Sequence, residues 1–218
     1  MFKPTFLFLT IVLFASAADV IQELMDMHIQ DGPTCVKEQY KLIECVAPHE
    51  TLINHTVSTF QPDTLYNIGF MRKGIQISKN VSECLGTDLK CDFPRFVVFT
   101  LDTMGFVGKK VYGDAFHCFI NAKTIDTIQH IPPPPTSVDA SGNHTIMNDL
   151  SIFQEFKNSA TEFVARKLYP TPSCTIGRIV DLYKAGIAAL DWCYVAYKLQ
   201  WGYPVEVEQF DAQKYCDN

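Results

Sequence analysis

The chain is predicted to fold as an all-α, disulfide-bonded helical bundle with long loops. Apolar residues recur every three or four positions over most of the segments that can be interpreted, which is the period of an amphipathic helix. Prolines and glycines stop these patterns and mark loops between them. The eight cysteines form an even set, which is typical of a disulfide framework in an exported protein.

Residues 1–17 are expected to be a secretory signal peptide. They combine one basic residue, Lys3, with an apolar run from Thr5 to Phe14 and small residues at Ala15 and Ala17. The apolar run is too short for a membrane anchor, because ten helical residues cover only about half of a hydrocarbon core of roughly 30 Å. We therefore expect a secreted, extracellular protein in which residues 18–218 form a single disulfide-linked domain.

The charge of the mature chain argues against two classes of partner. Removal of Lys3 leaves 17 basic against 24 acidic residues, a formal charge of −7. An acidic protein repels phosphate groups, so we expect neither nucleic acid nor an anionic membrane surface as a partner. No later segment has 18 uninterrupted apolar residues, so no membrane span is expected after signal cleavage.

All the cysteines follow the signal peptide, and in an oxidising compartment they are expected to form four disulfides among 105 possible pairings. They are Cys35, Cys45, Cys84, Cys91, Cys118, Cys174, Cys193 and Cys216. Continuous helices would separate Cys174 from Cys193 by about 28 Å and Cys35 from Cys45 by about 15 Å. A disulfide needs Cα atoms within about 7 Å, so neither of these two pairs is expected to form.

A run of four prolines, Pro132 to Pro135, raises the question of a domain boundary. Five cysteines precede this run and three follow it. If all eight pair within the chain, at least one bridge must cross the run. We therefore expect residues 131–147 to form an exposed Pro-rich loop within a single domain, whose parts before and after the loop are joined by a disulfide. Three sequons, at Asn54, Asn80 and Asn143, predict N-glycosylation of surface asparagines.

The first half of the chain gives three helix predictions and one gap. Residues 18–30 and 35–50 show short helical patterns, stopped by Gly32-Pro33 and by Pro48. Residues 51–79 give no firm prediction. A helix is favoured over a buried strand at 92–111, because Asp92 can cap it and Pro94 suits a first turn. Its predicted apolar face consists of Val97, Leu101, Met104 and Val111.

Two longer helices are predicted in the second half. Residues 149–168 carry apolar side chains at intervals of three and four until Pro170. The stretch from Cys174 towards Pro204 carries another such row, which comprises Ile176, Val180, Tyr183, Ile187, Leu190, Tyr194, Tyr197 and Trp201.

Two motifs in the first half resemble a known family. The stretch "KNVSECLGTDLKCD", followed by "YGDAFHCFINAK", is similar to the nematode secreted cysteine-rich family known as domain of unknown function 19. The stretch "TCVKEQYKLIECV" is similar to the opening helix of that family, and the resemblance covers roughly residues 34–123. This chain departs from the family pattern after Cys118. The family places further cysteines soon after the Phe-x-Cys element, whereas the next cysteine here is Cys174. The resemblance implies an all-helical extracellular domain and supplies no catalytic residue or ligand.

No motif predicts catalytic, metal or cofactor chemistry. The neighbouring His117 and Cys118 suggest a nucleophile beside a base, but adjacent side chains point apart and a catalytic thiol must be reduced. We interpret Cys118 as a disulfide cysteine. Carboxylates such as Asp102, Asp114 and Asp191 offer acid–base pairs, as any chain with 24 acidic residues does. The cysteine and histidine spacings do not match a zinc site, and no cofactor is expected.

The aromatic residues allow two interpretations, a packed core or a cavity for an apolar ligand. One cluster comprises Phe93, Phe96, Phe99, Phe106, Phe116 and Phe119, and a second comprises Phe153, Phe156 and Phe163. We favour the core. The sequence thus indicates a secreted glycoprotein without enzymatic activity that binds an unknown extracellular protein. The alternatives are a carrier of small apolar ligands or lipids and a secreted hydrolase with an unrecognised site.

Overall fold

Helices dominate the computed structural model of the chain, which describes residues 32–59, 62–122, 136–138, 144–146, 168–200 and 206–215. The helices are α3 (Pro33–Val46), α4 (Glu50–Thr59), α5 (Ile68–Leu85), α6 (Asp92–Val111), α7 (Phe116–Asn121) and α10 (Ile176–Gln200). Short 3-10 helices span Ala47–His49, Pro62–Tyr66 and Gln213–Tyr215. The predicted all-α, disulfide-bonded class is confirmed. The signal peptide and the helices predicted at 18–30 and 149–168 lie outside the described residues, except for Leu168.

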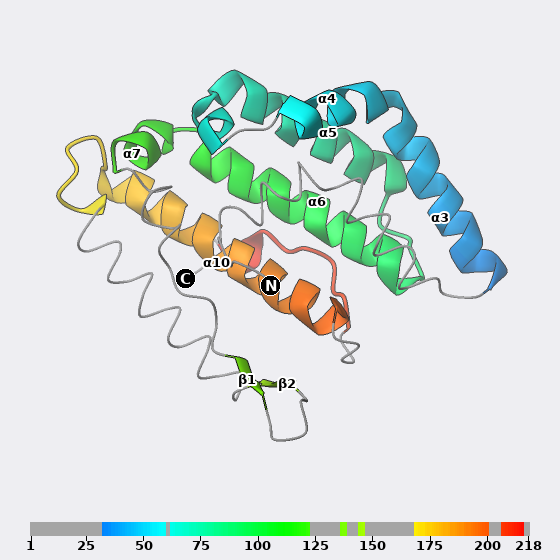
Figure 1. Cartoon of the computed structure of the whole chain (residues 1–218). Helices are drawn as coiled ribbons and strands as arrows, with labels where there is room; N and C mark the ends of the chain where they lie inside the picture. Colours follow the sequence, from blue (N-terminus) through cyan, green and yellow to red (C-terminus); the bar gives the residue numbers. More distant parts are fainter. Residues whose placement is uncertain are drawn as a thin grey trace.

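Helix α6 runs through the middle of the bundle, with α5 packed on one side and α10 on the other (Figure 1). Helix α3 lies at one edge of the molecule and contacts α5 and the start of α6. Because α6 has neighbours on opposite sides, twelve of its residues are buried, including Phe93, Phe96 and Phe99. Phe116 and Phe119 are buried as well, so these five rings fill the core as expected.

The predicted cap of α6 is wrong in detail. Cys91 occupies the N-cap position without a side-chain hydrogen bond, and Asp92 is the first helical residue. The carboxylate at this end comes from Glu38 on α3, which accepts hydrogen bonds from the backbone N–H groups of Lys90 at 2.8 Å and Cys91 at 3.0 Å. A negative charge there complements the helix dipole. Glu38 therefore adds a negative charge to that of Asp92 in the first turn of α6, and it fixes α3 to the start of α6.

Helix α10 confirms the helix predicted after Cys174, but its buried face differs from the predicted apolar row. Three alanines on α10, Ala185, Ala188 and Ala189, are buried in the main core cluster. Small side chains allow close approach of two helix backbones, and α10 lies along α6 (Figure 1). Beyond the alanines, Trp192 Nε1 donates a buried hydrogen bond of 2.8 Å to Thr100 Oγ1 on α6. The row that begins at Ile176 and Val180 starts on the exposed side of the helix.

Helix α5 begins within the stretch at 51–79 that gave no firm prediction and extends beyond it. Asn67 caps its start, where Asn67 Oδ1 accepts from the Phe70 N–H at 3.1 Å. Its end is followed by Gly86 at φ 72°, a left-handed conformation that favours glycine. The buried face includes Gly74, Ser78 and Ser82, so it shows no clear apolar row in the sequence.

Two disulfides hold α3 in place. Cys35 pairs with Cys91 at the start of α6, and Cys45 pairs with Cys84 on α5. The expectation that Cys35 and Cys45 do not pair with each other is confirmed. Lys41 Nζ also donates a hydrogen bond of 2.6 Å to the carbonyl oxygen of Leu85, at the C-terminal end of α5. A cation at that end is favoured by the helix dipole.

Part of the predicted Pro-rich loop at 131–147 is regular structure. Strands β1 (Thr136–Val138) and β2 (His144–Ile146) form an antiparallel ribbon in which Thr136 pairs with Ile146. β-branched residues favour extended backbone, and both strands contain them. The four prolines before β1 lie outside the described residues.

Candidate interaction site

The connection from Leu168 to the start of α10 carries the two most exposed large apolar side chains among the described residues. Tyr169 is 74% exposed and Ile176, at the start of α10, is 76% exposed. Val180 follows one helical turn after Ile176 and is also exposed. Ile176 and Val180 thus lie on one face of α10, and exposed apolar side chains that lie together mark sites of interaction more often than scattered ones do.

A disulfide anchors this loop to the core. Cys174 pairs with Cys118 on α7, with Cα atoms 4.6 Å apart. Cys118, Cys174, Ala122 and Leu168 form a buried cluster beneath the loop. This bridge joins the chain before the proline run to the chain after it, so the predicted crossing is confirmed. It also confirms that Cys174 does not pair with Cys193.

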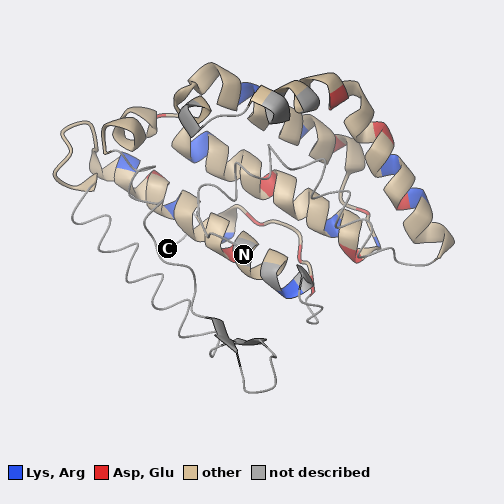
Figure 2. Cartoon of the chain, viewed as in Figure 1, with Lys and Arg blue, Asp and Glu red and all other residues tan. Residues whose placement is uncertain are grey.

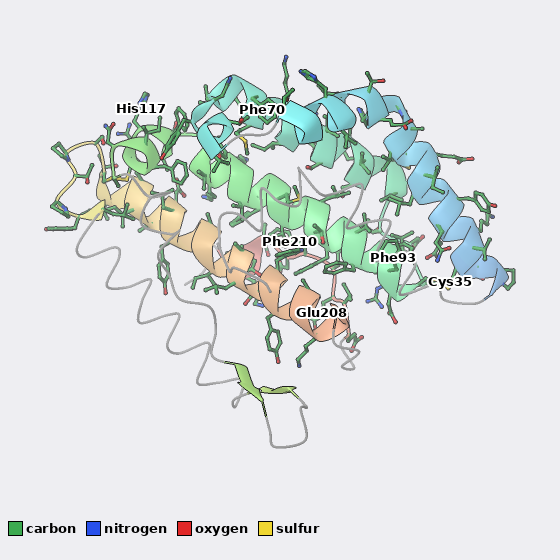
Figure 3. The ribbon with its side chains drawn as sticks, viewed as in Figure 1. Cys35, Phe70, Phe93, His117, Glu208 and Phe210 are labelled. Atoms are coloured by element: carbon green, nitrogen blue, oxygen red, sulfur yellow. A yellow bond between two sulfur atoms is a disulfide. The ribbon has the colours of Figure 1, made fainter. Side chains whose placement is uncertain are left out.

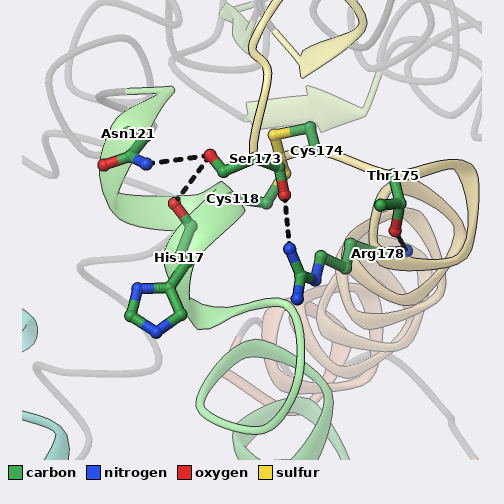
Figure 4. The surroundings of a disulfide bond; sticks show 7 residues. All are labelled: His117, Cys118, Asn121, Ser173, Cys174, Thr175 and Arg178. Atoms are coloured by element: carbon green, nitrogen blue, oxygen red, sulfur yellow. Dashed lines mark hydrogen bonds between the residues drawn. A yellow bond between two sulfur atoms is a disulfide. The ribbon is translucent and has the colours of Figure 1, made fainter.

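Hydrogen bonds centred on Ser173 fix the loop further (Figure 4). Ser173 Oγ donates to the carbonyl oxygen of His117 at 3.2 Å and accepts from Asn121 Nδ2 at 2.9 Å. The carbonyl oxygen of Ser173 accepts from Arg178 Nη1 at 2.8 Å. One serine therefore links the loop to both α7 and α10.

The local sequence "LYPTPSCT" explains the shape of the loop. The Thr171 N–H donates to the Leu168 carbonyl at 3.1 Å, and the Cys174 N–H donates to the Thr171 carbonyl at 2.9 Å. These are two successive turns, and prolines at 170 and 172 restrict the backbone between them. Because turns, prolines and the disulfide all act on seven residues, few backbone conformations are available to the loop.

A shallow pocket of about 650 Å³ lies between the loop and α7, open to solvent. Its lining consists of Ile120, Asn121, Pro170, Thr171, Pro172 and Ser173. Half of these residues are polar, and two of them, Asn121 and Ser173, already hydrogen-bond to each other. The pocket suits a protruding side chain or short segment of a partner better than an apolar ligand that must be enclosed.

The geometry does not assemble a catalytic group at the candidate residues. Cys118 is fully buried and its sulfur is bonded to Cys174, while the neighbouring His117 is exposed. The interpretation of Cys118 as a disulfide cysteine is therefore confirmed. The backbone of His117 takes part in the loop network, and the adjacent Cys118 has no free thiol for its ring to activate.

The three candidate carboxylates lie apart. Asp102 on α6 accepts a hydrogen bond from Ser82 Oγ on α5, and burial raises the pKa of Asp102 against the lowering effect of that bond. Asp191 on α10 accepts from Lys214 Nζ at 2.7 Å and from Tyr215 Oη at 2.8 Å. Asp114 is exposed in the turn between α6 and α7. None of the contacts in the described residues joins two of these carboxylates.

The described residues contain neither a metal-binding cluster nor a membrane-spanning helix. No group of three or more histidine, cysteine, aspartate or glutamate side chains there is placed to hold a metal ion. None of the described helices is both long and apolar enough to cross a membrane.

The predicted glycosylation sites occupy different places. Asn80 lies exposed on α5, where its Oδ1 accepts from Gln76 Nε2 at 2.8 Å. Asn54 lies within α4. Asn143 falls outside the described residues. Modification at each sequon stays a prediction.

No family model, curated protein or solved structure matches this chain. The resemblance to the nematode secreted family rests on the sequence motifs quoted above.

Proposed function

We propose that this chain is a secreted, disulfide-bonded glycoprotein that binds another extracellular protein and has no catalytic activity. One observation carries the proposal: Tyr169 is exposed on a loop, and Ile176 at the start of α10 that follows it, and a disulfide and the Ser173 hydrogen bonds hold this loop rigid. Loops fixed by a scaffold often carry binding residues, and an aromatic side chain held in place gives a large contact at low entropic cost.

The extracellular location is supported by the sequence and by the bridges. Disulfides persist in oxidising compartments and are rare in the cytosol. Three bridges together with the predicted signal peptide and sequons fit export. Membership of the nematode secreted family is a further proposal that agrees with this location.

A carrier of small apolar ligands is the second candidate, since the pocket beside the loop includes Ile120, Pro170 and Pro172. A carrier encloses most of the ligand surface, whereas this pocket is open and partly polar. A secreted hydrolase ranks third because the described carboxylates and histidines do not converge. We therefore favour a protein partner.

The test compares two variants of the tagged, secreted full chain. Tyr169→Ala/Ile176→Ala removes the exposed apolar side chains of the loop and of the start of α10, and Leu52→Ala removes an exposed apolar side chain on α4 as the control. Proteins cross-linked to the chain in native extracellular fluid are identified by mass spectrometry, and the affinity of each is then measured with purified components. We expect the loop variant to weaken a partner at least about tenfold, which corresponds to about 1.4 kcal/mol.

The control variant should bind that partner as the native chain does. Equal binding of the partner by the native chain and the loop variant would contradict the assignment of the loop. Turnover of a substrate by the purified chain would contradict the absence of catalysis.

A further inference from the structure

The outer face of α3 carries a row of exposed apolar side chains, remote in sequence from the loop described above. Val36 is 42% exposed, Tyr40 64% and Ile43 51%. Spacings of four and three residues place them on one face of the helix. Leu42 and Cys45 are buried on the other side, so α3 has apolar residues on two faces. Figure 3 shows side chains of α3 pointing outward at the edge of the molecule, with Cys35 at one end.

The helix that carries this row is held firmly. Its inner face is tied to α6 through the Cys35–Cys91 bridge and Glu38, and to α5 through the Cys45–Cys84 bridge and Lys41. The outer row is therefore presented in a fixed geometry. A fixed helix face is a surface that a second helix can match without ordering either one.

Charged residues flank the row on one side, and their order is unusual. Lys37 follows Val36 and Glu44 follows Ile43, so both lie on the same flank and both are exposed. Basic and acidic residues are both visible along α3 in Figure 2. The first turn of α3 contains no acidic residue and the last turn no basic residue. This order opposes the helix dipole, which favours acidic residues near the start and basic residues near the end.

A surface that is basic at one end and acidic at the other is complementary to itself after a half turn. We propose that the outer face of α3 binds the same face of a second copy of this chain, antiparallel about a two-fold axis near Tyr40. Val36 of each copy then faces Ile43 of the other, because the two residues lie about 10.5 Å apart on the helix and exchange places.

Exposed charges of opposite sign also face each other in this arrangement. In an antiparallel pair of this kind, one flank of a helix meets the same flank of its partner. Lys37 of each copy then lies within about 3 Å, along the axis, of Glu44 of the other. The two helix dipoles also run in opposite directions, so a charge order that is unfavourable in one helix becomes favourable in the pair. One helix face is smaller than the roughly 800 Å² that each partner buries in a standard interface, so the dimer is weak and depends on concentration.

The test is sedimentation equilibrium of the secreted full chain from about 1 µM to about 500 µM, a range that covers weak association. We expect reversible dimers. Lys37→Glu and Glu44→Lys each turn two attractive contacts into repulsive ones, and each should weaken association about tenfold. Neither change opposes the helix dipole, so neither should unfold α3. The double variant Lys37→Glu/Glu44→Lys restores complementarity and should dimerise as the native chain does.

Two further variants separate this face from the rest of the surface. Tyr40→Asp places a charge at the proposed axis and should abolish association. Leu52→Asp changes an exposed apolar residue on α4, outside both α3 and the loop, and should leave association unchanged. The proposal is overturned by a monomer at every concentration, by dimers that survive Tyr40→Asp, or by a double variant that stays as weak as the single ones. None of these outcomes depends on the partner proposed for the loop.

Discussion

Two of the disulfides have the same sequence separation but should stabilise the fold by different amounts. Cys35–Cys91 and Cys118–Cys174 each join residues 56 positions apart. The Cys45–Cys84 bridge lies inside the first of these loops and crosses neither end of the second. In the unfolded chain it shortens the path between Cys35 and Cys91.

The difference follows from the loop-closure entropy of the unfolded chain. With Cys45–Cys84 closed, the path from Cys35 to Cys91 contains ten residues before the inner bridge and seven after it, an effective loop of about 17 residues. Closing a loop of that length corresponds to about 3 kcal/mol of unfolding free energy, against about 4 kcal/mol for the 56-residue loop of Cys118–Cys174. Burial also favours a larger contribution to the unfolding free energy from Cys118–Cys174, because Cys118 is fully buried whereas Cys35 is partly exposed.

Urea unfolding monitored by circular dichroism measures the loss of unfolding free energy in two variants, Cys118→Ala/Cys174→Ala and Cys35→Ala/Cys91→Ala. We expect the first variant to lose about 1 kcal/mol more than the second. In a background that already lacks Cys45–Cys84, removal of Cys35–Cys91 should cost about 4 kcal/mol, since the inner shortcut is gone. Equal losses of unfolding free energy in the two variants would refute the nested-loop argument. So would a loss on removing Cys35–Cys91 that is the same with and without Cys45–Cys84.

Three smaller perturbations test the packing of α5, α6 and α10. Because burial raises the pKa of Asp102, the folded state favours the protonated carboxyl, and stability from this group falls as pH rises through its raised pKa. Asp102→Asn should therefore raise the melting temperature most at neutral pH and progressively less in acid; a gain independent of pH would contradict this cause. Gly108→Ala would place a Cβ 2.5 Å from Ile75 Cδ1, so we expect a loss of about 1–3 kcal/mol that Ile75→Ala in the same chain partly relieves. Trp192→Phe removes the donor to Thr100 and should cost about 1–2 kcal/mol in urea unfolding, and an unchanged midpoint would mean that the bond contributes nothing.

Sequence periodicity identified helices more reliably than it identified their buried faces. The row from Ile176 predicted α10 correctly, yet α10 packs through Ala185 and its neighbouring alanines. Alanine contributes little to an apolar pattern but allows two backbones to approach closely. The face that lies against a neighbouring helix therefore depends on the shape of that neighbour, which one sequence does not reveal.

The same physical reason explains the missed helix α5. Its buried positions follow helical spacing, but Gly74, Ser78 and Ser82 occupy three of them. A pattern search that looks for large apolar residues does not detect such a face. Asn67, which caps the helix, was the local signal that could have located its start.

The loop site was predictable only in part. Pro170 marked the end of a helix pattern, and parity required a bridge across the proline run. The choice of Cys118 and Cys174 depends on how α7 and α10 meet, and the exposure of Tyr169 depends on where the bridge holds the loop. Both are tertiary properties.

The most direct test of an extracellular, disulfide-held binding protein is mass spectrometry of the unreduced chain after secretion from eukaryotic cells. We predict a mature N-terminus near Ala18 and a peptide map that contains Cys35–Cys91, Cys45–Cys84 and Cys118–Cys174. The three bridges leave Cys193 and Cys216, so full pairing requires these two to join. A chain retained in the cell with free thiols, or a map that pairs these cysteines differently, would contradict the account.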